Sequence, residues 1–315
     1  MLHLRVISPA ELSGEVLKVL DECVGVVNIV VFPGAARSPA GDLVQFDIAR
    51  ESANEVIDRL QELGLHTEGS IAAEQIDLSI SQVADRAQEE APGDGDDAVV
   101  WAEFAQRLEE DIRLTWAFMA FLTIATLLVA IGVIVNSPIL IIGGMVMGPE
   151  FGAVAAIGFG LINVDRHLIG RALRTLALGF ATAVVITFAF ALAARWLGWI
   201  DVDSLNGHEE IEFIVKPDRW SFIVALLAGA AGVLSVTAGK SSALVGVFIS
   251  VTTVPAAGYF AVAAALSRWD DMAGSALQFG VNLAGMTISG VATLLVQKAY
   301  WSRFGIRLPA RPGPR

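Results

Sequence analysis

The chain has 315 residues, 55% of them hydrophobic, and a mean hydropathy of +0.63, whereas a soluble domain is about 45–50% apolar. Its 33 acidic and 21 basic residues give a net charge of −12, which argues against a nucleic-acid partner because such a partner requires a basic face. The single cysteine, Cys23, excludes an intrachain disulfide, and nothing in the composition predicts a metal centre or another cofactor.

The negative charge is confined to one part of the chain. Residues 1–113 carry a net charge of −15, and residues 114–315 carry +3. This division predicts an acidic soluble part followed by an apolar membrane part. The first residues lack the charged and apolar regions of a secretory signal, so we expect the soluble part to stay on the side where it is made.

Residues 1–77 alternate between strand and helix patterns. The predicted strands are 2–7, 26–32, 43–48 and 65–76, the helices are 10–23 and 52–63, and 33–41 is a turn region. The order is βαββαβ, that of a ferredoxin-like α+β domain. This topology resembles small-molecule regulatory domains of the ACT type, which implies either ligand sensing or a structural, assembly role.

Two segments connect this domain to the membrane part. Residues 78–98 are rich in acidic side chains and predict a flexible connector. Residues 99–113 predict an amphipathic pre-membrane helix, because Trp101, Phe104, Leu108 and Ile112 fall on one helical face. We expect this helix to lie at the membrane surface or to lead straight into the first span.

Residues 114–298 predict a polytopic α-helical membrane domain. Six segments are long enough to cross about 30 Å of hydrocarbon: 114–135, 139–162, 175–197, 220–238, 243–266 and 274–297. A basic, proline-rich tail follows at 299–315. The loops and tails on the side of the N-terminal domain hold most of the lysines and arginines, so the positive-inside rule places both termini in the cytoplasm.

The membrane domain contains two matching proline motifs. Pro149 to Gly152 and Pro255 to Gly258 both read Pro-x-x-Gly, near the midpoints of the second and fifth segments. A proline frees a backbone carbonyl where no water reaches it, and such breaks persist where they line a cavity or are buried in protein. The second and fifth segments occupy corresponding places in oppositely oriented triplets, which predicts a 3+3 inverted repeat with a site near the bilayer midplane.

Glu150 is the one acidic residue deep in a predicted span. An ionisable group there costs at least about 2.5–3.5 kcal/mol on insertion scales, so it indicates a function such as proton coupling. The alternatives are a protonated or hydrogen-bonded structural glutamate, or one that water reaches from a cavity.

Four further polar residues are candidates for a substrate or ion path. Thr252 and Thr253 precede Pro255 and could bond the carbonyls that it frees. Gln278 and Asn282 share one side of the sixth segment, and they either line a polar path with Glu150 or bond between helices.

Two motifs carry a resemblance to a known family. Ser137 to Pro149 reads SPILIIGGMVMGP, and Gly239 to Val247 reads GKSSALVGV, with Val254-Pro255 following. Together they resemble the uncharacterised prokaryotic membrane family catalogued as domain of unknown function three-eight-nine. The family often has two prolines at the second break, whereas Ala256 follows Pro255 here, so we expect a milder break. The resemblance implies a prokaryotic inner-membrane architecture and no established activity.

The sequence therefore predicts a transporter or channel for an unidentified small solute or ion, with a regulatory or assembly domain in the cytoplasm. We expect a homo-oligomer, because the small domain and the glycine-rich helices both offer pairing surfaces. No serine, histidine or cysteine set suggests catalysis, so we do not expect an enzyme. The alternative is a membrane-anchored sensor or scaffold whose soluble domain binds a ligand or partner protein.

Overall fold

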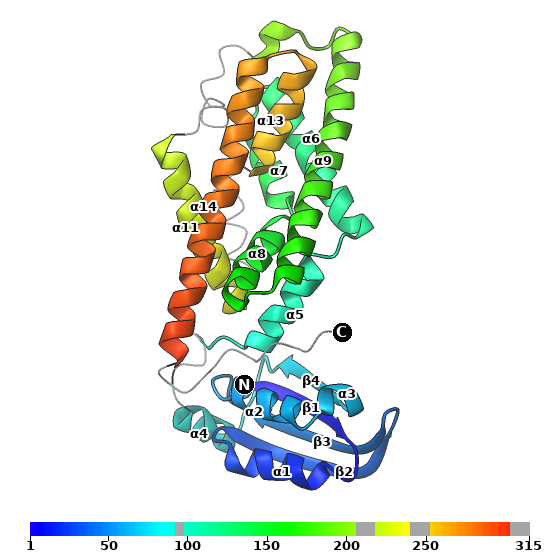
Figure 1. Cartoon of the computed structure of the whole chain (residues 1–315), viewed down its shortest axis with the longest axis vertical. Helices are drawn as coiled ribbons and strands as arrows, with labels where there is room; N and C mark the ends of the chain where they lie inside the picture. Colours follow the sequence, from blue (N-terminus) through cyan, green and yellow to red (C-terminus); the bar gives the residue numbers. More distant parts are fainter. Residues whose placement is uncertain (92, 94–97, 206–217, 240–252, 303–315) are drawn as a thin grey trace. The chain divides into compact units, whose positions relative to one another are not determined.

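The computed structural model describes residues 1–91, 93, 98–205, 218–239 and 253–302 (Figure 1). The chain divides into two compact units. The first comprises residues 1–105 and 296–315, and the second comprises residues 106–295. The boundaries fall inside two helices, α5 (Trp101–Asp111) and α14 (Trp269–Ser302), so each of these helices has residues in both units.

The N-terminal unit is built on a four-stranded antiparallel sheet in the order β2-β3-β1-β4 (Figure 1). Its elements are β1 (Leu2–Ser8), α1 (Ser13–Glu22), β2 (Val26–Arg37), β3 (Ala40–Ile48), α2 (Ala53–Glu62), α3 (Leu65–Glu68) and β4 (Ser70–Gln75). In the register of the central strands, Leu4 lies opposite Phe46 and Val6 opposite Val44. All four side chains are fully buried, because alternate residues of a strand point to the same face.

Two predicted boundaries in this unit are wrong. The predicted turn at 33–41 is largely strand, because β2 runs on to Arg37 with a register shift between Phe32 and Ala36. The predicted strand 65–76 begins instead with the short helix α3, and only Ser70–Gln75 pairs with β1. Gly64 ends α2 as expected, with a left-handed φ of 81°.

The predicted connector is partly helical. Within residues 78–98, the helix α4 (Gln82–Glu90) follows its N-cap residue Ser81. The Ser81 side chain accepts a hydrogen bond from the Ala84 amide. In the predicted amphipathic segment a helix forms as α5, and its apolar residues Trp101, Phe104 and Leu108, together with Ile112 just after its end, are at most 2% exposed. Its position at the membrane surface stays a prediction.

The second unit consists of apolar helices. They are α6 (Trp116–Ile134), α7 (Pro138–Met147), α8 (Phe151–Asn163), α9 (Arg166–Trp196), α11 (Arg219–Thr237), α13 (Thr253–Ala265) and the main part of α14, with a 3-10 turn η1 (Val202–Leu205) before α11. Polar side chains cap three helix starts: Thr115 accepts from Phe118, Asp165 from His167 and Leu168, and Asp218 from Ser221.

Among the described residues, four helices are long and apolar enough to cross a membrane, namely α6, α9, α11 and α14. The helices α7 and α8 are bent by 48° relative to each other at the break between them. If this pair is one broken span, the number of candidate spans among the described residues rises to five. The fifth predicted segment, 243–266, is represented by α13, because 240–252 lies outside the described residues. The helices α9 and α14 both begin before the corresponding predicted segments, 175–197 and 274–297. The helix α9 begins at Arg166, nine residues before the predicted start at 175. These helices indicate a multi-pass membrane protein.

Glycines let the helices approach closely. A Cβ at Gly144 would lie 2.6 Å from Val129 of α6, and one at Gly258 would lie 2.8 Å from the same side chain. Val129 therefore packs against α7 on one side and α13 on the other. Small residues at helix contacts serve the same purpose in membrane proteins generally.

Candidate functional site

The first proline motif ends one helix and starts another. The C-cap of α7 is Gly148, Pro149 follows, and Glu150 occupies the N-cap position of α8. The Glu150 side chain does not cap the helix, although it is only 5% exposed. Among the described residues, its Oε2 atom has no hydrogen-bond partner. A buried polar oxygen without a partner is costly and calls for an explanation.

The second motif lies in the described part of α13. Thr253 is the first described residue of this helix and Pro255 is the third, and the residues before Thr253 lie outside the described part of the chain. Both residues are buried, and the Thr253 Oγ1 atom also has no partner among the described residues. Thr252 lies outside the described residues.

The two motifs meet at Gly148. A Cβ on Gly148 would touch the Glu150 Oε2 atom and would lie 2.7 Å from Val254 Cγ2. The Glu150 carboxyl group therefore lies over Gly148, beside the first turn of α13. The fold therefore brings together the segments that contain Pro149 and Pro255, which are far apart in the sequence.

A second carboxyl group lies at the start of α8. A Cβ on Gly152 would lie 2.7 Å from the Asp111 Cγ atom, at the end of α5. Asp111 is exposed, unlike Glu150. Partial desolvation by the surrounding protein and repulsion by Glu110 raise the pKa of Asp111. The nearby Ile112 carbonyl accepts a 2.6 Å hydrogen bond from Thr175 of α9, which fixes the end of α5 against the unit.

Gln278 and Asn282 are both buried in α14, 1% and 2% exposed. The Gln278 Nε2 group donates to the Asn282 Oδ1 atom at 3.4 Å, one helical turn away. This bond lies within one helix, and the predicted interhelical bond and the predicted path with Glu150 both stay predictions.

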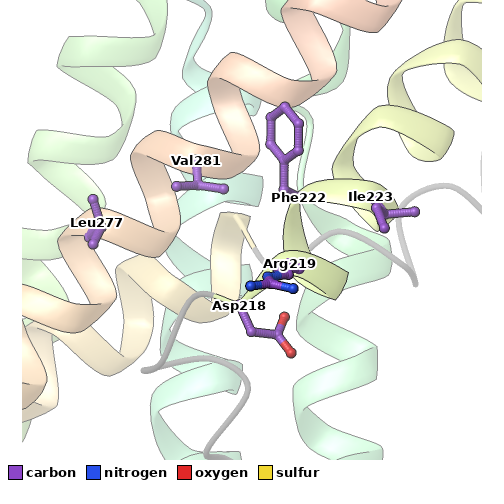
Figure 2. Close-up of a pocket in the computed structure, with 6 residues that line it drawn as sticks. All are labelled: Asp218, Arg219, Phe222, Ile223, Leu277 and Val281. Carbon is purple, nitrogen blue, oxygen red and sulfur yellow. The ribbon is translucent and has the colours of Figure 1, made fainter.

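The described helices of the second unit line pockets that include the following two. One, with a volume of about 660 Å³, separates the start of α11 from α14 and is lined by Asp218, Arg219, Phe222, Ile223, Leu277 and Val281 (Figure 2). The other, of about 240 Å³, is lined mainly by phenylalanine and alanine side chains of α9, α13 and α14. Ala256 and Ala257 of the second motif line the smaller pocket. Both are mainly apolar, and neither is lined by a predicted site residue.

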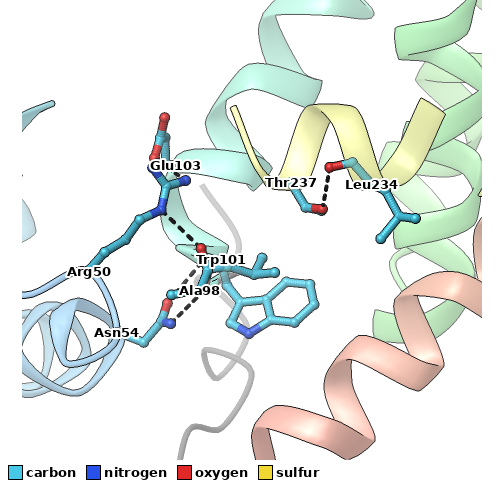
Figure 3. Close-up of polar contacts among 8 residues, drawn as sticks. Arg50, Asn54, Ala98, Trp101, Glu103, Leu234 and Thr237 are labelled. Carbon is cyan, nitrogen blue, oxygen red and sulfur yellow. Dashed lines mark hydrogen bonds and ion pairs between the residues drawn. The ribbon is translucent and has the colours of Figure 1, made fainter. Parts of the chain in front are cut away.

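A polar cluster of the first unit holds the segment that leads into α5 (Figure 3). Asn54 of α2 donates to the Val99 carbonyl at 2.7 Å and accepts from the Trp101 amide at 2.9 Å. Arg50 donates to the Ala98 carbonyl at 2.9 Å and lies 3.7 Å from Glu103. The prediction missed this cluster because no periodic pattern marks a side chain that bonds to a distant backbone.

Comparisons with known proteins agree with the resemblance found in the sequence motifs. The family model described as "Domain of unknown function (DUF389)" matches residues 145–288. Uncharacterized protein MJ0678 of Methanocaldococcus jannaschii is 21% identical over 248 residues, which cover 79% of this chain and 74% of the relative. No solved structure matches the chain.

The matched range begins just before the first proline motif and ends within α14, so it includes Glu150, Thr253 and the contact at Gly148. The predicted resemblance to the DUF389 family, a membrane family of unknown function, is confirmed.

Proposed function

We propose that the protein is a membrane transporter or channel for a small solute or ion, with its site where the two proline motifs meet. One observation carries this proposal: Glu150 Oε2 and Val254 share the space beside Gly148, and Glu150 and Thr253 both hold buried oxygens without described partners. Irregular backbone and ionisable groups at membrane depth are typical of substrate and ion pathways.

An inverted repeat is supported by the spacing of helix ends with left-handed backbone. Five described residues of the second unit have left-handed φ values just after helix ends, Asn136, Val164, Gly198, Gly239 and Ser267, and four of them form two equally spaced pairs. Positions 136 and 164 are 28 apart, as are positions 239 and 267. This spacing differs by three residues from the register of the two Pro-x-x-Gly motifs, in which Pro149 corresponds to Pro255 and Glu150 to Ala256.

Helix packing supports the same repeat. Gly258 of α13 packs against Val129 of α6, the first helix of the other triplet. In return, Phe151 of α8 packs against Gly232 of α11, the first helix of the second triplet. Both α6 and α11 have 19 residues. Each motif-bearing helix therefore contacts the first helix of the opposite triplet, as a pseudo-two-fold axis would require.

The remaining parts of the proposal follow from the sequence. We interpret the N-terminal sheet as a ferredoxin-like domain with a regulatory or assembly role, and the second unit as six spans. We place the protein in the inner membrane of a prokaryote, as a homo-oligomer, with both termini in the cytoplasm. We do not propose an enzymatic reaction.

Transport is tested by reconstituting the full chain in liposomes and screening ions and small solutes for flux and conductance. We expect at least one to cross, and Glu150→Gln to change its rate, because the variant removes the buried charge. The control is Glu109→Gln, which removes an exposed carboxylate from α5. A silent screen with correctly folded protein, together with ligand-induced thermal stabilisation of the full chain, would favour the sensor alternative instead.

A further inference from the structure

The carboxyl group of Glu150 is buried in the second unit, in surroundings that disfavour an unpaired charge. Glu150 is 5% exposed, and its Oε2 atom has no partner among the described residues. An ionised carboxylate in such surroundings requires a counter-charge or must take up a proton. Among the described residues, no positively charged group bonds to this oxygen.

The neighbouring helices do not supply that charge at the contacts described. The glycines of α7 and α8 and the Phe151 ring meet apolar residues from five helices: Val129 of α6, Ile169 of α9, Gly232 of α11, Val254 of α13 and Val291 of α14. The titratable group at these contacts is Asp111 of α5, beside Gly152. Asp111 itself is influenced by two charged residues of its own helix: Glu110 raises its pKa, and Arg107 acts in the opposite direction.

We propose that Glu150 binds a single positive charge, either a proton or a monovalent cation, with the Thr253 hydroxyl as a neutral oxygen ligand from the opposite motif. One carboxylate neutralises one unit charge. A divalent ion ordinarily has several carboxylate ligands, and the described residues contain no group of three or more His, Cys, Asp or Glu side chains placed to hold a metal ion.

The exposed Asp111 gives the charge a point of entry. It lies next to Gly152, two residues from Glu150, and belongs to the charged helix that precedes the first span. A surface carboxylate near a buried one attracts cations, although Arg107 on the same helix offsets part of its charge. The role of the bound cation as the coupling ion or the cargo rests on the proposed transport function, whereas binding itself does not.

Binding is tested on the full chain in lipid nanodiscs, without any transported solute. In the proton arm, infrared spectra at neutral pH should contain the C=O band of a protonated carboxyl group in the wild type and in Glu109→Gln, and Glu150→Gln should lack it. In the cation arm, Na⁺ or K⁺ should raise the unfolding temperature relative to N-methylglucamine. Glu150→Gln should then lower the cation affinity at least about tenfold, since a charge-assisted contact is lost.

Two further variants keep the test decisive. Thr253→Val, which replaces the hydroxyl by a methyl group, should weaken binding by a smaller factor. If Glu150→Gln does not fold, Glu150→Asp should shift the carboxyl band or reduce the cation affinity. Identical spectra and identical cation responses in wild type and Glu150 variants would overturn the proposal, as would tighter binding of Ca²⁺ or Mg²⁺ than of either monovalent ion.

Flux through the same preparations separates this inference from the proposed function. A protein that binds the charge at Glu150 but conducts nothing retains the site and loses the transport role. A protein that transports a solute, with spectra and cation responses unchanged by Glu150→Gln, retains the transport role and loses the site.

Discussion

At the scale of single residues, the site depends on the missing side chain of Gly148. Its backbone is extended, with φ −68° and ψ 122°, so an L-residue is sterically allowed there. The constraint is instead the space that the Glu150 carboxyl group and Val254 already occupy. Gly143, five residues earlier in α7, has nothing within 4 Å of its missing Cβ.

These two glycines give opposite predictions. Gly148→Ala should destabilise the protein by about 1–3 kcal/mol, because an added methyl group must displace its neighbours. Gly143→Ala should be neutral or stabilising by up to about 1 kcal/mol, since alanine favours a helix interior. Thermal unfolding of the detergent-solubilised full chain measures both. Equal effects of the two substitutions would contradict the contact between the motifs.

At the scale of elements, α5 is the helix that links the two units. Its start is held by Asn54 in the first unit, through the Val99 carbonyl and the Trp101 amide. Its end is held in the second unit, where Thr175 donates to the Ile112 carbonyl and Asp111 lies against Gly152. Contacts from α2 and from α8 therefore fall at opposite ends of one helix.

Asn54→Ala should release the start of α5. The substitution leaves a buried amide and a buried carbonyl without partners, which should cost about 2–3 kcal/mol locally. We expect faster hydrogen exchange at residues 99–104, measured by mass spectrometry on the full chain, and little change around Thr175. Gln61→Ala, which removes an amide from the last turn of the same helix, is the control. Unchanged protection at 99–104 would show that Asn54 does not hold this segment.

At the scale of the whole molecule, charge separates the acidic N-terminal part from the membrane part. Basic residues then bias the orientation of the apolar helices. The only native thiol, Cys23, is 8% exposed, so engineered cysteines can report which side of the membrane each part faces.

In a Cys23→Ala background, Asp201→Cys should react with an impermeant maleimide in intact cells. Glu74→Cys should react only after the membrane is opened, because the N-terminal domain is expected in the cytoplasm. Both positions are exposed on the protein surface. The reverse labelling pattern would place the termini outside and would refute the orientation derived from the positive-inside rule.

By itself, the sequence determined the features that depend on local pattern. Strand alternation gave the βαββαβ order, the period of Trp101, Phe104, Leu108 and Ile112 gave a buried helical face, and Pro149 marked the bend between α7 and α8. Local patterns erred at the start of the predicted strand 65–76, where residues 65–68 close a helical turn after Gly64.

Only the tertiary structure decided which distant residues are neighbours. The contact of Gly148 with Val254, the place of Asp111 beside Gly152 and the bonds from Asn54 to the segment before α5 all join separate elements. Hydrophobic periodicity predicts which face of a helix is buried, but it does not predict which element that face packs against. The Glu150 Oε2 atom is buried without a partner among the described residues because of how the helices pack together, and no single segment encodes this.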